Sequence, residues 1–350
     1  MEGKVQHSIS RRNFLFGTGA VCLSLALGSS PFVLGGCNKS KDDSPIGLAV
    51  EFTDHAACAY IAQEKGLFEA KGLNLSAYES YVTGTALASA LSRGDIQAAY
   101  ICLAPAINTY ANAGVPFKIV AGSHKYGYGL AVDPNKITTI KDLEKEGMRV
   151  GCVQPGSAAD VMFQKIMDNY QLDKQAVSNN IRKMNPPKQL LAVKSGQLDA
   201  VCIPEQWATM SEDMGFEMLL TAEDVWPDMQ GSVLIVKDEL IDNHPEIVEN
   251  LVAVTQEATE WAVNNPEEAS GIVAAQLQAT GDTVFPTEVA ETAKELEITA
   301  NVMLRSMDRL EYTTDIDPTA IQDMIDYMLS LEYIKSGFDA SEIIDLSFLK

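Results

Sequence analysis

The stretch "SALSRGDIQAAYICLAP" at residues 89–105 has a near-copy, "LLAVKSGQLDAVCIPEQ", at residues 190–206. In each copy an apolar, helix-like run ends at a glycine, Gly94 or Gly196, and a short hydrophobic run then leads to a proline. Glycine just past a helix readily adopts the left-handed backbone of a helix cap. The apolar run that follows it is typical of a buried strand. Each copy therefore predicts a helix, a tight turn, a strand and a loop.

Strand-like and helix-like segments alternate on both sides of each copy. Residues 46–52 and 73–80 read as strands, residues 55–66 and 83–94 as helices, and the same order begins again at residue 147. Repeated strand–helix units form a parallel sheet with helices on its faces. The chain is thus expected to be an α/β protein that builds two similar lobes one after the other.

The region after residue 237 contains amphipathic helical runs and no further strand. A proline stands near the first turn of each run, at Pro245, Pro266, Pro286 and Pro318, as is common at helix starts. These helices are expected to pack back on lobe 1, which requires the chain to cross between lobes near residues 122–127 and 226–234. Lobe 1 would then comprise residues 46–123 and 233–350, and lobe 2 residues 124–232.

The charge balance excludes one class of partner. The 350 residues carry 48 Asp and Glu against 26 Lys and Arg, a formal net charge of −22. A field of this sign repels phosphate backbones, so no nucleic acid partner is expected.

The first 36 residues have the character of an export signal. "SRRNFLF" at residues 10–16 resembles a twin-arginine signal, and "LGGC" at residues 34–37 looks like the cleavage and lipidation box of a bacterial lipoprotein. We expect residues 1–36 to be removed, Cys37 to carry lipid, and residues 37–45 to form a polar tether at the outer face of the cytoplasmic membrane. The alternative is an ordinary signal whose end happens to contain a cysteine.

Four cysteines lie in the expected folded region, Cys58, Cys102, Cys152 and Cys202. Most of them fall in predicted buried strands, where a free thiol behaves as a small hydrophobic group. We expect unpaired thiols, with a Cys152–Cys202 bridge as the alternative. Because the chain has no Cys-x-x-Cys pair, a zinc site is not expected. No cofactor is expected either.

Five segments in order resemble one family. They are "YIAQEKGLFEAKGLNL" (60–75), "LSRGDIQAA" (91–99), "VGCVQPGSAADVMF" (150–163), "LDAVCIPEQW" (198–207) and "DELIDNHPEIVENLVAVTQEATEWAVNNPEEA" (238–269). Together they are similar to the extracytoplasmic solute-binding proteins of ABC importers in the nitrate, sulfonate and taurine group. "DHA" at residues 54–56 is also similar to relatives that bind pyrimidine precursors of thiamine. The resemblance implies a type II periplasmic-binding-protein fold, a ligand cleft between two lobes, permease and ATPase partners, and a monomer that is not an enzyme.

The cleft can be placed from the strand pattern, because ligands of open α/β sheets bind beyond the carboxyl ends of the strands. Six loops qualify: residues 53–58, 81–86, 103–106, 154–158, 185–188 and 204–207. Glycine and small hydroxyl residues at helix starts suit an anionic or polar oxygen group, although the hydroxyls could instead only cap their helices. The candidate ligand-binding residues are Asp54, His55, Tyr81, Thr83, Gly84, Thr85, Pro105, His124, Gly156, Ser157, Glu205, Trp207 and Trp226.

The arginines argue against a strongly cationic cleft. None of Arg93, Arg149, Arg182, Arg305 and Arg309 falls in a predicted cleft loop. The expected solute is small and polar or anionic, of the sulfonate, taurine or nitrate kind, whereas Asp54 and Glu205 would suit donors on an amine or heterocycle. The alternatives are a thiamine pyrimidine precursor as ligand, an enzyme of pyrimidine synthesis on the same fold, and a sensory subunit.

Overall fold

The computed structural model describes residues 44–94, 96–285 and 296–350, without the side chains of residues 282 and 283. The export signal, Cys37, most of the tether and Pro286 lie outside the described residues. Among the helices that the structure describes, none has the length and apolar character needed to cross a membrane.

The first sheet has six strands in the order β11-β4-β10-β3-β1-β2. Its strands are β1 (Pro45–Glu51), β2 (Asn74–Tyr81), β3 (Ala98–Cys102), β4 (Phe117–Tyr126), β10 (Gln230–Lys237) and β11 (Leu310–Glu311). The alternation of strand and helix makes β1, β2 and β3 parallel. β10 lies antiparallel between β3 and β4, so a strand from the second half of the chain completes the first sheet.

The second sheet has five strands in the order β7-β6-β8-β5-β9. They are β5 (Tyr128–Val132), β6 (Val150–Cys152), β7 (Ile181–Lys183), β8 (Ala200–Pro204) and β9 (Glu217–Thr221). The three predicted strands are parallel. β5 and β9 were not predicted, and β5 runs antiparallel between β8 and β9.

Both copies of the repeated motif form the expected elements. α3 (Gly84–Arg93) ends at Gly94, which has a φ of 97°, and β3 follows. α7 (Pro186–Lys194) is followed by Gly196, with a φ of 68°, and then by β8. The fold class is therefore the predicted α/β arrangement with two sheets.

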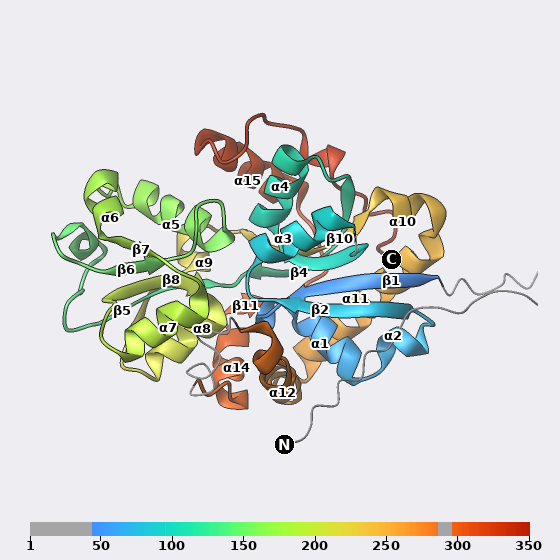
Figure 1. Cartoon of the computed structure of the whole chain (residues 1–350), viewed down its shortest axis with the longest axis horizontal. Coiled ribbons are helices and arrows are strands. Elements are labelled where there is room, and N and C mark those ends of the chain that lie inside the picture. The colour runs from blue at the N-terminus through green and yellow to red at the C-terminus, as the bar shows by residue number, and fades with distance from the viewer. Residues whose placement is uncertain (1–43, 95, 286–295) are drawn as a thin grey trace, which may run out of the picture. The chain divides into compact units, whose positions relative to one another are not determined.

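Helices cover the faces of both sheets (Figure 1). Those of the first are η1 (Asp54–Ala56), α1 (Ala57–Glu64), α2 (Leu67–Ala70), α3, α4 (Leu103–Ala113), α10 (Asp238–Asn243), α11 (Pro245–Asn264) and α12 (Pro266–Val284). Those of the second are η2 (Ile140–Glu144), α5 (Ala158–Asn169), α6 (Lys174–Asn180), α7, α8 (Glu205–Glu212) and α9 (Ala222–Val225). The C-terminal helices α11 and α12 pack against α1, as predicted.

The last elements touch the helices of both sheets. α14 (Ala300–Met307) packs on α12 and also on α8. α15 (Pro318–Ser330) packs on α4, while the Tyr327 hydroxyl donates to Asp168 of α5 at 2.7 Å. The 3-10 helix η3 (Ala340–Glu342) packs on α15. The C-terminal segment thus ties the two halves of the fold together.

The chain passes from the first sheet to the second at Gly127, between β4 and β5. Gly127 has a φ of 91°, in the left-handed region that favours glycine. A Cβ atom there would lie 2.7 Å from Cε1 of His124 and 2.8 Å from Nε2 of His55. Only glycine therefore fits this crossing without displacing two buried imidazoles.

Candidate functional site

A small cavity of about 30 Å³ lies where the carboxyl ends of strands from both sheets meet. Its lining residues are Glu51, Thr53, Val82, Thr83, Gly84, Cys102, Pro105, Tyr128, Val153, Ser157, Ala158, Ala159, Pro186 and Pro204. Each of the six loops expected from the strand ends contributes at least one of them. We call this space the inner cavity.

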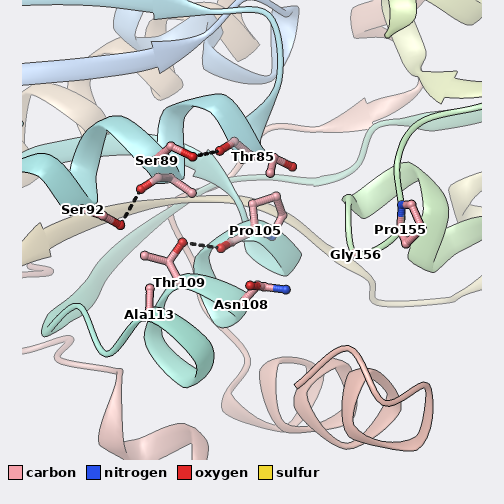
Figure 2. Close-up of a pocket in the computed structure, with 10 residues that line it drawn as sticks. Thr85, Ser89, Ser92, Pro105, Asn108, Thr109, Ala113, Pro155 and Gly156 are labelled. Atoms are coloured by element: carbon pink, nitrogen blue, oxygen red, sulfur yellow. Dashed lines mark hydrogen bonds between the residues drawn. The ribbon is translucent and has the colours of Figure 1, made fainter. Parts of the chain in front are cut away.

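Two more open pockets adjoin the inner cavity. One, of about 160 Å³, lies between the helices α3 and α4 and the loop before α5, and shares Pro105 with the inner cavity. Figure 2 shows Thr85 and Ser89 of α3 and Asn108 of α4 on one side, with Pro155 and Gly156 opposite. The other, of about 640 Å³, is lined by Tyr81, Thr83, Thr85 and Asn185 among others. Both outer pockets share lining residues with the inner cavity, Pro105 in the first and Val82 and Thr83 in the second.

Seven of the thirteen candidate residues line these spaces. Thr83, Gly84, Pro105 and Ser157 line the inner cavity, and Tyr81, Thr85 and Gly156 line the outer pockets. The other six, Asp54, His55, His124, Glu205, Trp207 and Trp226, are buried and outside all three linings.

The two hydroxyl residues of the inner cavity cap their helices. Thr83 Oγ1 accepts the backbone N–H of Ala86 at 3.2 Å, and Ser157 Oγ accepts that of Asp160 at 3.2 Å. Each hydroxyl proton stays able to donate to a solute. The carboxylate of Asp160 also accepts the N–H of Gly156 at 3.3 Å and pairs with Lys183 at 2.6 Å. An acidic group thus already lies at the start of α5.

Glu51 is the charged residue among the described lining residues of the inner cavity, and it is not one of the thirteen candidates predicted from the sequence. Its side chain is 3% exposed, and Oε1 accepts the backbone N–H of Cys102 at 2.7 Å. Burial raises the pKa of Glu51 to about 7. A Cβ atom on Gly84 would lie 2.3 Å from Oε1 of Glu51 and 2.8 Å from Cγ of Pro105, so Gly84 makes room for this carboxyl group. The signal was present in the sequence, since Glu51 is the one charged residue of the apolar run at residues 46–52.

Asp54, His55 and His124 lie beneath the inner cavity rather than in its wall. The rings of His55 and His124 lie tilted against each other with centroids 4.4 Å apart. Burial lowers the pKa of His124 to about 4 and that of His55 well below its usual range. Both imidazoles are therefore neutral at pH 7. The backbone N–H of Asp54 donates to Oε1 of Gln206 at 2.7 Å, and the Asp54 carboxyl group accepts the hydroxyl of Ser306.

Glu205, Trp207 and Trp226 join elements to one another instead of facing the inner cavity. Oε1 of Glu205 accepts Nη1 of Arg309 at 3.1 Å, and burial raises the pKa of Glu205 to about 7. Trp207 packs against Phe52 and Phe285, with ring centroids 6.2 and 6.3 Å away. Trp226 meets the ring of Tyr327 at 5.4 Å. Glu205 and Trp207 belong to α8, which starts directly after Pro204, so its first turn faces α14 and Phe52. Trp226 directly follows α9 and faces α15.

All four cysteines of the described region are free and buried. Cys152 and Cys202 are direct partners across β6 and β8 but do not form the alternative bridge. The Cys202 thiol donates instead to the carbonyl oxygen of Ala159 at 3.5 Å.

The chain has relatives among known proteins. A protein of Brucella abortus (strain 2308) that is named as a binding protein is 26% identical to it over 343 residues. The alignment covers 95% of this chain and 97% of that protein. The structure of this chain is similar to the alkanesulfonate-binding protein SsuA from Xanthomonas axonopodis pv. citri bound to MOPS, with a TM-score of 0.70, 15% identity and coverage of 87% and 99% of the two chains. It is also similar to the periplasmic nitrate-binding protein NrtA from Synechocystis PCC 6803, with a TM-score of 0.68, 14% identity and coverage of 88% and 87%.

These likenesses show the periplasmic-binding-protein fold that the sequence predicts. The model of the NMT1-like family matches residues 41–277, which is more than half of the chain. The protein belongs to the NMT1-like family.

Proposed function

We propose that this protein is the solute-binding component of an ABC importer and captures a small polar organic solute between its two lobes. The observation that carries the proposal is the inner cavity, whose wall is built jointly by strand ends and helix starts of both sheets. Two-lobed proteins close about a hinge when one ligand contacts both lobes. The fold neighbours that bind an alkanesulfonate buffer and nitrate support this role of a binding protein and not an enzyme.

A sulfonate-like or nitrate-like solute is the first candidate class. Helix starts point backbone N–H groups at bound oxygen atoms, and α3 and α5 begin at the inner cavity. α7 also begins there, but its first two residues are Pro186 and Pro187, which have no N–H to donate. The hydroxyl groups of Thr83 and Ser157 add donors for the same oxygen atoms.

A nitrogen heterocycle, such as a pyrimidine precursor of thiamine, is the second candidate class. Glu51 favours it, because a buried carboxyl group in the wall accepts hydrogen bonds from N–H or NH₂ groups. Among the described lining residues of the inner cavity there is no Lys, Arg or His to offset Glu51.

Native mass spectrometry of the full chain from its own source, followed by calorimetry with the solute that co-purifies, tests the proposal. We expect one small molecule per chain, tight binding on titration, and recovery of the solute chemically unchanged. Alkanesulfonates, taurine, nitrate and aminopyrimidines serve as defined probes of the two classes. Conversion of the solute to a product would overturn the binding role, and a chain that binds no member of either class would overturn the assignment of the solute.

We further propose that lipid on Cys37 anchors the protein outside the cytoplasmic membrane. The box at residues 34–37 and the polar segment after it support this. Wild-type protein should partition into the detergent phase of a phase-separation assay, and Cys37→Ala should move to the aqueous phase or stay unprocessed. An aqueous wild-type protein would contradict the anchor, while leaving the solute-binding proposal intact.

A further inference from the structure

Three side chains of different chemistry converge beside the inner cavity, and two of them, Glu51 and Cys102, are part of its wall. Glu51 ends β1, His55 lies in η1 and Cys102 ends β3. Their carboxylate oxygen, ring nitrogen and sulfur atoms all lie within 4.8 Å of one another, and the three residues are 3%, 1% and 4% exposed. In the part of the chain that the structure describes, no other three His, Cys, Asp or Glu residues meet in this way.

The hydrogen bonds of His55 leave one nitrogen available. Its Nε2 lies 2.7 Å from the carbonyl oxygen of Gly127, which can only accept, so Nε2 carries the ring proton. Nδ1 of the neutral ring therefore presents a lone pair, and it faces Sγ of Cys102 at 3.6 Å. A backbone carbonyl that fixes the tautomer of a histidine in this way is typical of histidines that ligate metals.

The thiol of Cys102 has more acceptors around it than it has protons. Oε2 of Glu51 lies 2.8 Å from Sγ, and Nδ1 of His55 is the second acceptor. One thiol proton satisfies only one of them. The hydroxyls of Tyr128 at 2.7 Å and Ser232 at 3.6 Å both donate to the sulfur, and this offsets part of the effect of burial and of Glu51, which raise the pKa of the Cys102 thiol.

We propose that Glu51, His55 and Cys102 bind one divalent transition metal ion of the zinc class, with a fourth coordination position open to the inner cavity. The ligands would be Oε2, Nδ1 and Sγ. Tetrahedral zinc with ordinary bond lengths separates a sulfur and a nitrogen ligand by roughly 3.6 Å, which matches the observed distance of 3.6 Å. The oxygen of Glu51 would move away from the sulfur by about 0.8 Å to reach the same separation.

The charges of the site fit such an ion. A thiolate, a carboxylate and a neutral imidazole carry two negative charges, so a divalent cation makes the buried group neutral overall. The metal replaces the thiol proton, which passes to solvent. Both Glu51 and Cys102 line the inner cavity, so the open position would face the place proposed for the solute.

The inference goes beyond the proposed function, because it gives the cavity an electrophilic anchor. An oxygen or nitrogen atom of a solute could occupy the fourth position, and the ion would cancel the repulsion between Glu51 and an anion. The linear sequence does not show the site, since it has no Cys-x-x-Cys pair and the ligands come from positions 51, 55 and 102.

Zinc binding to the full chain tests the inference. The protein used for this test carries Cys22→Ser and Cys37→Ser, which remove the two thiols that lie outside the described region. It is purified metal-free in detergent. We expect one tight zinc ion per chain by calorimetry, and cobalt substitution should give thiolate-to-cobalt absorption. Cys102→Ser should weaken zinc binding by at least about 100-fold, more than loss of an outer partner of a metal ligand costs.

Cys202→Ser is the control, because Cys202 is also a buried strand thiol but lies in the middle of β8 and outside the lining of the inner cavity. It should keep full zinc affinity. Equal zinc affinity in Cys102→Ser and the control would show that zinc binds elsewhere on this acidic chain, and would overturn the inference. If the protein with all three proposed ligands intact shows no thiolate-to-cobalt absorption, that result alone overturns the inference. Since only zinc and cobalt are titrated, either result leaves the solute-binding proposal untouched.

Discussion

At the scale of single residues, Glu51 places a buried carboxyl group at the end of the apolar strand β1, in the wall of the inner cavity. A charged residue inside an apolar strand must find a partner or a role, since burying an unpaired charge is costly, and this alone marks Glu51 as unusual. Its partner could not be predicted. The N–H of Cys102 reaches Glu51 because β1 and β3 pair in a register that sets Val50 beside Tyr100, and that register is a property of the assembled sheet.

A second residue-scale feature is the carboxyl group of Glu205, whose pKa is raised from 4.5 to about 7 by burial. The folded protein holds this proton between pH 4.5 and 7 while the unfolded chain releases it. The stability that the proton contributes is thus complete below pH 4.5 and is lost as the pH rises through 7. The contribution is at most about 3 kcal/mol.

We predict that Glu205→Gln makes the free energy of unfolding depend less on pH between 4.5 and 8. Urea titrations of wild type and variant at several pH values measure this. The exposed Glu260→Gln in α11 is the control and should keep the slope of the wild type. A Glu205→Gln variant with the full wild-type slope would show that Glu205 titrates normally in the folded protein.

At the scale of elements, α8 differs most from expectation. The residues after Pro204 were expected at the cleft, but α8 begins at once and directs Gln206 toward the first lobe. Oε1 of Gln206 accepts the N–H of Asp54 at 2.7 Å, and Nε2 of Gln206 donates to the carbonyl oxygen of Phe52 at 3.3 Å. β5 and β9 were missed for another reason: β5 is fixed by pairing with β8, and β9 by pairing with β5, rather than by any alternation of their own.

We predict that Gln206→Ala loosens the contact between the lobes. Leaving the buried N–H of Asp54 unpaired costs about 1–3 kcal/mol, so a solute that needs the closed arrangement should bind about ten-fold more weakly and dissociate faster. Stopped-flow and calorimetric measurements with the co-purifying solute test this. Gln189→Ala is the control, because Gln189 is equally buried but donates to Met184 within its own lobe. An equal loss of affinity in both variants would show that the hydrogen bonds of Gln206 to the first lobe have no specific effect on solute binding.

At the scale of the whole molecule, the internal repeat predicts two α/β units, and the structure has two sheets. The repeat does not predict that each sheet also contains antiparallel strands. β10 joins the first sheet only after the chain has built the second, and β5 begins the second sheet directly after the crossing at Gly127. Such connections depend on how the assembled lobes pack, which a local pattern of strands and helices does not encode.

The central claim is that one solute binds in the inner cavity and contacts both lobes, and filling the cavity from each side tests it most directly. Gly84→Val adds bulk from α3, and Ala158→Leu adds it from α5; both residues line the cavity. Gly271→Ala in α12, where a Cβ atom meets nothing within 4 Å, is the control. Circular dichroism confirms that each variant is folded before titration.

The measurement is the calorimetric affinity of the co-purifying solute for these three variants and the wild type. The account predicts that Gly84→Val and Ala158→Leu each lose at least about ten-fold in affinity, equivalent to about 1.4 kcal/mol, while Gly271→Ala keeps the wild-type value. Full affinity in either folded cavity variant would contradict a site shared by the two lobes.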